Sequence, residues 1–277
     1  MDLGLKGRVA LVAGGSRGLG FAIARELVRE GADVAIAARD PERLAVAERS
    51  LRDIARGRVL AARVDLRDDG EVRRWVDGVA GEAGRLDIAV TNGGGPPIGH
   101  PTAFDVAAYR EAADTVLYPA ISLALAALPH LRARGWGRLL FIASETVIRP
   151  VGGLALSGVA RSGILRFAQG LVAELGASAI TVNVLAPAYL RTTPVERAAA
   201  ELAATRGTDI ETEVRAMSGH IPLGRVGAPE EFAAVAAFLA SERAGFVTGT
   251  VQLVDGGASA VGAQPSHLGF SSKDVFA

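Results

Sequence analysis

Short apolar runs alternate along the chain with longer segments in which apolar residues recur every three or four positions. Uninterrupted apolar runs are typical of parallel strands, because both faces of such a sheet are covered. The sequence therefore predicts strands at 9–13, 33–38, 58–64, 86–91, 138–143, 180–185 and 251–254. It predicts helices at 21–28, 41–56, 68–83, 104–134, 157–175 and 229–240, and helical structure over about 192–222.

The regular alternation of strand and helix predicts an α/β fold, in which a seven-stranded parallel sheet is doubly wound with helices on both faces. A chain of 277 residues suits one large domain of this class, and no linker divides it. We expect a single domain at 1–258 that includes a substrate lid at about 192–222. A loosely held C-terminal tail is expected at 259–277.

The first predicted strand runs directly into a glycine-rich turn, within the sequence RVALVAGGSRGLG at 8–20. Gly14, Gly18 and Gly20 let the backbone turn tightly, and the helix that follows presents free N–H groups at its start. A strand, glycine turn and helix in this order bind the pyrophosphate of a dinucleotide. The spacing G-x-x-x-G-x-G differs from the G-x-G-x-x-G fingerprint, and a tight turn without a ligand is the alternative interpretation.

Composition excludes several other classes of function. Thirty basic and thirty acidic residues cancel, so we expect neither a nucleic-acid partner nor an anionic membrane partner. The chain has no cysteine, which excludes disulfides and thiolate sites, and it has no signal-peptide pattern; a cytoplasmic location is expected. The four histidines lack metal-ligand spacing, so no metal site is predicted; they are His100, His130, His220 and His267.

Seven motifs, in a fixed order and with regular gaps, cover nearly the whole chain. They are AGGSRGLG (13–20), VDLRD (64–68), LDIAVTNGGG (86–95), GRLLFIAS (137–144), ITVNVLAP (180–187), PLGRVGAPEEFAAVAAFLAS (222–241) and VTGTVQLVDGG (247–257). In these motifs the sequence resembles the classical short-chain dehydrogenases/reductases, especially their 3-oxoacyl-carrier-protein reductase-like branch. The resemblance implies a single-domain Rossmann fold and a nicotinamide-dependent oxidoreductase that acts on a small carbonyl or alcohol.

The resemblance also implies which residues bind the cofactor. They are Gly14, Ser16, Arg17, Gly18, Leu19, Gly20, Arg39, Asp65, Leu66, Asn92, Gly93, Gly94, Arg161, Pro187 and Thr192. The glycines would face the phosphates, and Asp65 with Leu66 would hold the adenine edge. Asn92 would lie beside the adenosine ribose, or would instead fix the backbone between strands.

The choice between the two nicotinamide cofactors is argued from charge. Enzymes that select NAD place a carboxylate at the end of the second strand, where this chain has Ala38 followed by Arg39. Arg17 lies in the glycine loop, and two guanidinium groups suit a 2′-phosphate better than a bare hydroxyl. We therefore predict NADP(H) rather than NAD(H). The alternative is that both arginines are ordinary surface residues.

The chain departs from the family at three of its four catalytic positions. Ser144 is present, but Ser157 stands where the family has tyrosine, Arg161 where it has lysine, and Val116 where it has asparagine. Serine is a much weaker acid than a phenol, and arginine stays protonated, so it does not readily relay protons. We predict Ser144, Ser157 and Arg161 as the catalytic set, with Tyr189 as the leading substitute acid. The stretch LALSGVAR (154–161) also resembles a variant branch of the family, which carries Ser and Arg at the positions of Ser157 and Arg161.

Two predicted helices, at 104–134 and 157–175, are apolar nearly all round, and such helices must be covered on every side. Together with the resemblance, this predicts a homodimer or homotetramer. Three functions remain open. The first is an active NADP(H)-dependent oxidoreductase, the second a catalytically impaired NADP(H)-binding sensor or scaffold, and the third a partner subunit of an active paralogue.

Overall fold

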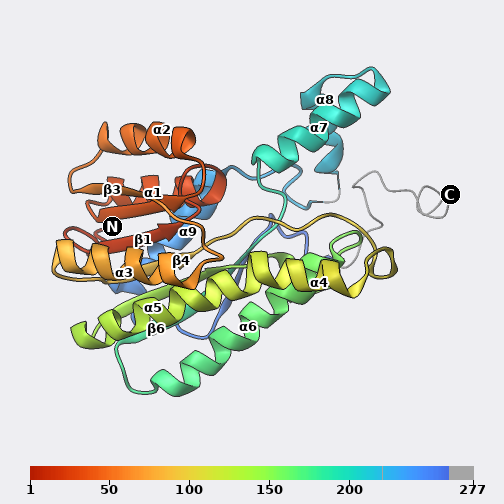
Figure 1. The fold of residues 1–277 in the computed structure, drawn as a ribbon. Helices are drawn as coiled ribbons and strands as arrows, with labels where there is room; N and C mark the ends of the chain where they lie inside the picture. Colours follow the sequence, from red (N-terminus) through yellow and green to blue (C-terminus); the bar gives the residue numbers. More distant parts are fainter. Residues whose placement is uncertain (220, 262–277) are drawn as a thin grey trace.

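The computed structural model describes residues 1–219 and 221–261. They form one parallel sheet of seven strands in the order β3-β2-β1-β4-β5-β6-β7 (Figure 1). The strands are β1 (Val9–Ala13), β2 (Asp33–Ala38), β3 (Val59–Arg63), β4 (Ile88–Thr91), β5 (Gly137–Ile142), β6 (Ile180–Pro187) and β7 (Val251–Val254). The order runs outward from β1 and β4 in both directions, which confirms the predicted doubly wound α/β fold.

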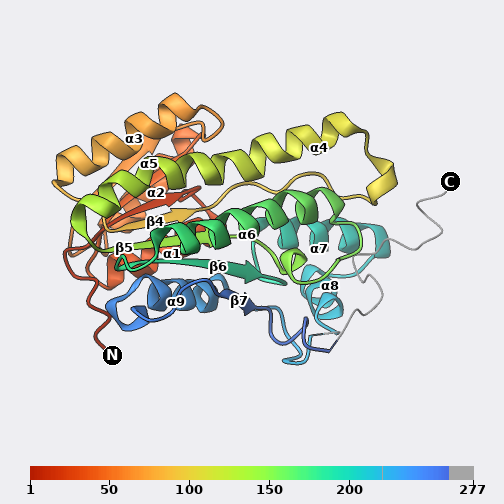
Figure 2. The same cartoon turned by 90° about the horizontal axis from the view of Figure 1, so that it is seen from below.

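Helices cover both faces of the sheet (Figure 2). They are α1 (Gly18–Arg29), α2 (Pro41–Arg52), α3 (Asp69–Ala83), α4 (Val106–Ala112), α5 (Tyr118–Arg134), α6 (Ala155–Leu175), α7 (Thr193–Arg206), α8 (Ile210–Met217) and α9 (Pro229–Ala240). Alternate residues of a strand enter opposite layers. Leu11 packs in the cluster of α3, α5 and α6, while Val12 packs in the cluster of α1, α2 and α9. This double burial explains why the strands are continuous apolar runs.

The long helical segment predicted at 104–134 is interrupted in the structure. A π-helical turn, η2 (Ala113–Leu117), separates α4 from α5, and in it the Tyr118 N–H donates to the carbonyl of Ala113. Pro119 follows directly and has no N–H to donate, so the ordinary helical bonding pattern is broken at this point. Val116, at the family's asparagine position, lies in this turn.

Other element boundaries differ by a few residues. Helix α1 begins at Gly18 rather than at 21, so the last glycines of the loop form its first turn. Helix α2 ends at Arg52 rather than at 56, and β6 continues to Pro187 rather than stopping at 185. By length and composition the run Val106–Arg134 could cross a membrane, but half of its most apolar window is buried inside the protein, as in a core helix.

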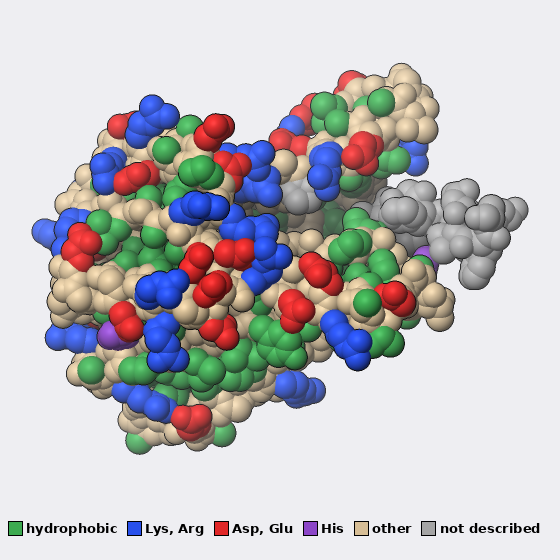
Figure 3. Space-filling model, viewed as in Figure 1, with side chains coloured by type: hydrophobic (Ala, Val, Ile, Leu, Met, Phe, Trp, Pro, Cys, Tyr) green, Lys and Arg blue, Asp and Glu red, His purple; other side chains and the backbone are tan. Residues whose placement is uncertain are grey.

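Helices α7 and α8 occupy the predicted lid segment and project from the body beyond the carboxyl end of the sheet (Figure 1). Their own small apolar cluster includes Ala199, Val214 and Met217. The surface is hollowed between this projection and the body, and acidic and basic side chains are interspersed around the hollow (Figure 3). The fold therefore places an accessible cleft where the carboxyl ends of the strands meet the lid.

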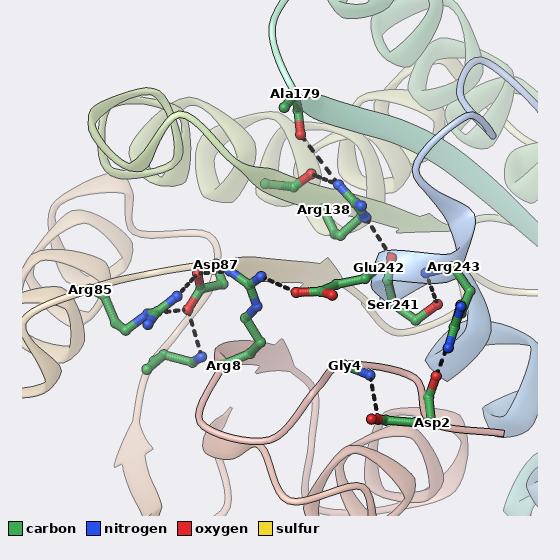
Figure 4. Close-up of polar contacts among 12 residues, drawn as sticks. Asp2, Gly4, Arg8, Arg85, Asp87, Arg138, Ala179, Ser241, Glu242 and Arg243 are labelled. Carbon is green, nitrogen blue, oxygen red and sulfur yellow. Dashed lines mark hydrogen bonds and ion pairs between the residues drawn. The ribbon is translucent and has the colours of Figure 1, made fainter.

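At the opposite, amino end of the sheet, Asp87 lies fully buried within a group of donors (Figure 4). The Arg85 guanidinium donates to both carboxylate oxygens, at 2.7 and 2.6 Å, and an Arg8 Nη donates at 3.2 Å. The Val9 N–H adds a bond of 2.9 Å. Arg8 also pairs with Glu242, at 2.5 Å, so these charges join β1, β4 and the segment after α9.

Arg138 extends this network into β5, although it is only 2% exposed. Its guanidinium donates to the carbonyls of Ser241 at 2.9 Å and Gly137 at 2.8 Å, and to that of Ala179 at 3.3 Å. Burial and the neighbouring Arg8 charge lower the pKa of Arg138 to about 10. The Nε and Nη1 donors of this buried cation are thereby directed at backbone oxygens, which is how a buried charge is tolerated.

Candidate cofactor and active site

The glycine loop has the geometry of an anion cradle. Gly14 and Gly18 have positive φ, 60° and 57°, a backbone conformation that side-chain-bearing residues avoid. A Cβ at Gly20 would lie 2.3 Å from the carbonyl oxygen of Gly14, whereas a Cβ at Gly18 would meet nothing within 4 Å. Arg17 precedes α1 and its side chain does not cap the helix, so the first N–H groups of α1 are open to a ligand.

Asn92 follows β4 and points at this loop. Its Nδ2 donates to the carbonyl of Ala13 at 3.3 Å and to that of Gly14 at 3.5 Å. A Cβ at Gly14 would lie 2.7 Å from the same nitrogen. In the structure, the Asn92 amide therefore fixes the backbone of the loop, which is the alternative role considered for it from sequence.

The ends of β2 and β3 form the next part of the cleft. Arg39 lies exposed at the end of β2, and a cleft lined by Arg39, Arg63, Asp65 and Arg74 opens beside it. The nearest carboxylate in sequence, Asp40, accepts from the N–H groups of Glu42 and Arg43, each at 3.1 Å, and so caps α2. That side chain is engaged by the helix start rather than presented to a ribose.

Asp65 is paired with Arg67, whose Nη2 lies 2.7 Å from its Oδ2. These hydrogen bonds lower the pKa of Asp65 to about 2. The remaining predicted cofactor residues lie at strand ends or helix starts along the same edge: Ser16 in the glycine turn, Leu19 in the first turn of α1, Leu66 after β3, Gly93 and Gly94 after β4, Pro187 at the end of β6 and Thr192 before α7. The edge thus brings the predicted set together, and its open amides and glycines fit a dinucleotide.

Arg161 and Ser157 come from the first two turns of α6 and face the ends of β4 and β5. Arg161 Nη1 donates to Ser157 Oγ at 2.8 Å, and Nε donates to the carbonyl of Ala143 at 3.0 Å. Its Nη2 reaches the carbonyl of Gly94 at 3.5 Å. Burial lowers the pKa of Arg161 to about 10, and no carboxylate within residues 1–219 and 221–261 pairs with it. The guanidinium is therefore a cation held by neutral acceptors alone.

Ser144 follows β5 directly, at the position predicted for it. Its Oγ accepts from the N–H of Thr146 at 3.3 Å and caps the short helix η3 (Glu145–Val147), which leaves the hydroxyl hydrogen for another acceptor. Ser157 is 8% exposed and also accepts, from Arg161. Both serines can consequently donate a hydrogen bond to an oxygen placed beside them.

A second group of polar side chains lies near this edge, and of its members only Tyr189 was predicted from the sequence to have a functional role. Glu145 and Arg149, four residues apart, form an ion pair of 2.5 Å with side chains 5% and 16% exposed. Arg149 also hydrogen-bonds Tyr189, the tyrosine singled out from the sequence, and its Nε contacts Ser259 Oγ at 3.4 Å. The acid–base pair at i and i+4 directly after Ser144 was the sequence signal that could have revealed this group.

Among the residues that the structure describes, no three histidine, cysteine or acidic side chains gather as a metal ion would require. His100 precedes the short helix η1 (Pro101–Ala103), whereas His130 lies in the last turns of α5 and pairs with Asp77. His220 and His267 lie outside the described residues.

Comparison with known proteins agrees with this geometry. A family model described as enoyl-(acyl carrier protein) reductase matches residues 13–259. The cis-4-hydroxycyclohexanecarboxylate dehydrogenase of Sinomonas cyclohexanicum is 36% identical, and the cyclohexanol dehydrogenase of Rhodococcus sp. (strain TK6) 33%; each match covers 92% of this chain and 97% of the relative. The crystal structure of L-sorbose reductase from Gluconobacter frateurii with NADPH and L-sorbose superposes with a TM-score of 0.89 at 32% identity, covering 92% of this chain and 98% of that chain. The chain therefore belongs to the short-chain dehydrogenase/reductase family of oxidoreductases.

Proposed function

We propose that this protein is an NADP(H)-dependent oxidoreductase that interconverts a small alcohol and its carbonyl compound. The observation that carries the proposal is the Arg161–Ser157 hydrogen bond of 2.8 Å, at the edge of the sheet that also holds Ser144 and the glycine loop. When bound there, a nicotinamide supplies or accepts the hydride. The named relatives oxidise cyclohexanol and a hydroxycyclohexanecarboxylate, so six-membered cyclic alcohols and ketones are the first substrates to test.

The residues of the site divide the remaining work. Ser144 and Ser157 donate hydrogen bonds to the substrate oxygen, which gains negative charge as hydride reaches the carbonyl carbon. The Arg161 guanidinium holds Ser157 in place and adds a fixed positive charge close to that oxygen, where burial strengthens its effect. Arg161 also has donors suited to the hydroxyls of the nicotinamide ribose. These roles need no proton transfer by arginine.

The preference for NADP(H) is supported by the distribution of charge. Arg17 and Arg39 are exposed on the two segments that flank the predicted 2′-phosphate position, and the Asp40 carboxylate is engaged as the cap of α2. A phosphate gains charge-assisted hydrogen bonds from such groups, whereas a ribose hydroxyl gains little. We expect NADPH to bind more tightly than NADH by about 1–3 kcal/mol.

One experiment tests both parts of the proposal. NADPH oxidation is followed with cyclohexanone and other small ketones, and both nucleotides are titrated by calorimetry at fixed salt. Arg39→Ala should lose most of the preference for NADPH, while Arg49→Ala, an exposed arginine in the last turn of α2, should not. Equal affinities for the two nucleotides, or an unaltered Arg39→Ala variant, would contradict the cofactor assignment.

The second function, a cofactor-binding protein with impaired catalysis, is favoured by one observation. The hydroxyl of Ser157, which stands at the position of the family's tyrosine, is buried and already bonded to Arg161. In that case NADPH binds with the same preference, but no ketone or alcohol is turned over. Titration together with turnover therefore separates the two functions.

We also propose that two copies associate through α5 and α6. Both helices carry buried residues on the side facing the sheet, yet Leu125 is 53% exposed and Val159 is 61% exposed on their outer surfaces. Exposed apolar side chains on adjacent helices are typical of an interface between subunits. Val159→Glu should convert a dimer or tetramer at micromolar concentration into monomer or insoluble protein, as measured by sedimentation. A wild-type protein that sediments as a stable monomer would contradict the proposal.

A further inference from the structure

Tyr189 lies at the point where three strands of the sheet end together. Backbone pairing sets Ile142 opposite Leu185 and Pro187 opposite Val254, so the residues that follow β5, β6 and β7 emerge side by side. Tyr189 follows β6, and Ser144 follows β5. The neighbouring Ala188 N–H donates to the carbonyl of Val254 at 3.2 Å, which fixes the start of the turn. The topology therefore puts Tyr189 on the β6 side of the cleft, one strand away from Ser144.

The backbone at Tyr189 is strained. Its φ of 51° is the only positive φ among the described residues that are not glycine. A bulky residue pays for this left-handed conformation, on the order of 1 kcal/mol or more, and glycine or asparagine would adopt it at less cost. The carbonyl of Tyr189 accepts from the Gly227 N–H at 3.0 Å, so the surrounding fold holds the strained turn in place. Strain of this kind commonly marks a side chain whose position serves function.

The hydroxyl of Tyr189 is oriented by a chain of charges. A guanidinium can only donate, so in the bond between Arg149 and Tyr189 the phenol oxygen accepts, and its own hydrogen is directed elsewhere. Arg149 is held in turn by the buried Glu145, at 2.5 Å. Burial and the Glu145 charge raise the pKa of Tyr189, which keeps the phenol protonated at neutral pH. The phenol is thus held protonated next to the Arg149 guanidinium, in the turn that follows β6.

The proposed function leaves one requirement unmet, because neither serine is acidic enough to supply a proton and Arg161 does not release one. We propose that Tyr189 is the catalytic acid of this protein and that Arg149 is its positioning residue. This inference rests on the proposed oxidoreductase function. The proton would then come from the turn after β6, and not from α6, where Ser157 stands at the position of the family's tyrosine.

The proton and electron balance is complete with these groups. In the direction of reduction, hydride adds to the carbonyl carbon with both its electrons, and the electron pair of the C=O π bond moves to oxygen. That oxygen forms a new O–H bond with the proton of Tyr189, whose own O–H bond breaks. The resulting phenolate lies against the Arg149 guanidinium, which stabilises its charge, and it regains a proton from solvent. Alcohol oxidation follows the same steps in reverse.

The experiment compares Tyr189→Phe with Tyr118→Phe, a matched change at a tyrosine that is 55% exposed on α5. For NADPH-dependent reduction of cyclohexanone, Tyr189→Phe should lower kcat/KM about a hundredfold or more, while leaving NADPH affinity within about twofold. Arg149→Met should lower kcat and change its pH profile, and Arg149→Lys should restore part of the activity. Tyr118→Phe should behave as wild type.

A second readout does not depend on turnover. Cyclohexanone binding to the complex with NADP⁺ is measured by calorimetry, and Tyr189→Phe should weaken it about fivefold to tenfold through the lost hydrogen bond. A Tyr189→Phe variant with wild-type kcat/KM, or with wild-type ketone affinity, overturns the assignment, as does a wild-type complex that binds no ketone. Failure of the proposed function can be told apart from failure of this assignment. If the proposed function is wrong, the wild-type protein itself does not oxidise NADPH.

Discussion

Each end of the sheet holds an arginine whose pKa is lowered to about 10, Arg138 buried and Arg161 half-buried, but the two have different partners. At the amino end, Arg138 belongs to a network in which Asp87 accepts from Arg8, Arg85 and a backbone N–H. At the carboxyl end, Arg161 has a serine and two carbonyls for partners and no carboxylate among the described residues. The network at the amino end therefore contains a buried carboxylate, whereas the described partners of Arg161 are all neutral.

This contrast predicts that the amino end contributes to stability and the carboxyl end to function. A buried charge whose partners are removed is costly, whereas a charge with no counter-ion can be removed without leaving another charge behind. A guanidinium with no carboxylate partner among the described residues is typical of functional sites, where local stability is given up for interactions with a ligand.

The largest expected effect is on folding, from Asp87→Asn. The change leaves two guanidinium groups without their buried carboxylate, so the free energy of unfolding should fall by about 3 kcal/mol or more. Asp77→Asn is the matched control, because that carboxylate is 57% exposed and, among residues 1–219 and 221–261, pairs only with His130; its loss should cost less than about 1 kcal/mol. Chemical denaturation followed by tryptophan fluorescence measures the free energy of unfolding of both variants. A similar loss in the two would contradict the prediction that the buried network at the amino end stabilises the fold.

The second effect is on catalysis, from Arg161→Met. Loss of the fixed charge should lower kcat about a hundredfold or more, while the free energy of unfolding changes by no more than about 1 kcal/mol. Arg166→Met, at an exposed arginine five residues along α6 that bonds only Gln169 in the structure described, should alter neither quantity. If Arg161→Met instead destabilised the fold as Asp87→Asn is expected to, the contrast between the two ends would be wrong.

The sequence predicted this arrangement unevenly, for physical reasons. Apolar runs and glycine turns are local signals, so the seven strands, their order of occurrence and the edge that carries the glycine loop could all be predicted. Asp87 and Arg138 stand at strand starts and look like ordinary surface charges, because their burial depends on partners from distant segments. The same is true of Arg149, which meets Tyr189 only in the folded chain.

Backbone conformations were harder still to predict. The positive φ of Tyr189 is imposed by tertiary contacts, since tyrosine has no preference for it. The π turn before α5 could have been suspected from Pro119, but a proline there also suits a plain helix start, which gives no interruption. The cofactor and catalytic roles carried over from the family remain predictions, to be tested by the variants above.

The smallest effect concerns Asp65, a partly exposed carboxylate at the carboxyl end that does have a charged partner. Hydrogen bonds from Arg67 lower its folded-state pKa to about 2, below the ordinary value of 3.8. A group whose pKa is depressed by folding contributes stability that is fully present above its unfolded pKa and is lost as the pH falls through its folded pKa. Asp65→Asn should therefore differ from wild type by a constant amount near neutral pH, converge with it below about pH 4, and match it only below about pH 2.

The same variant sharpens the contrast between the two ends. Since the Asp65–Arg67 pair is open to solvent, its contribution to folding is screened, and the difference at neutral pH should lie near the limit of detection in denaturation curves. Arg67→Gln removes the same pair from the other side and should give the same stability difference. If Asp65 also contacts the adenine edge, as the family resemblance implies, Asp65→Asn should weaken NADPH binding and Arg67→Gln should not. Equal nucleotide affinities in both variants would assign Asp65 to local structure, and the carboxyl end would then contain a purely structural ion pair like those of the amino end.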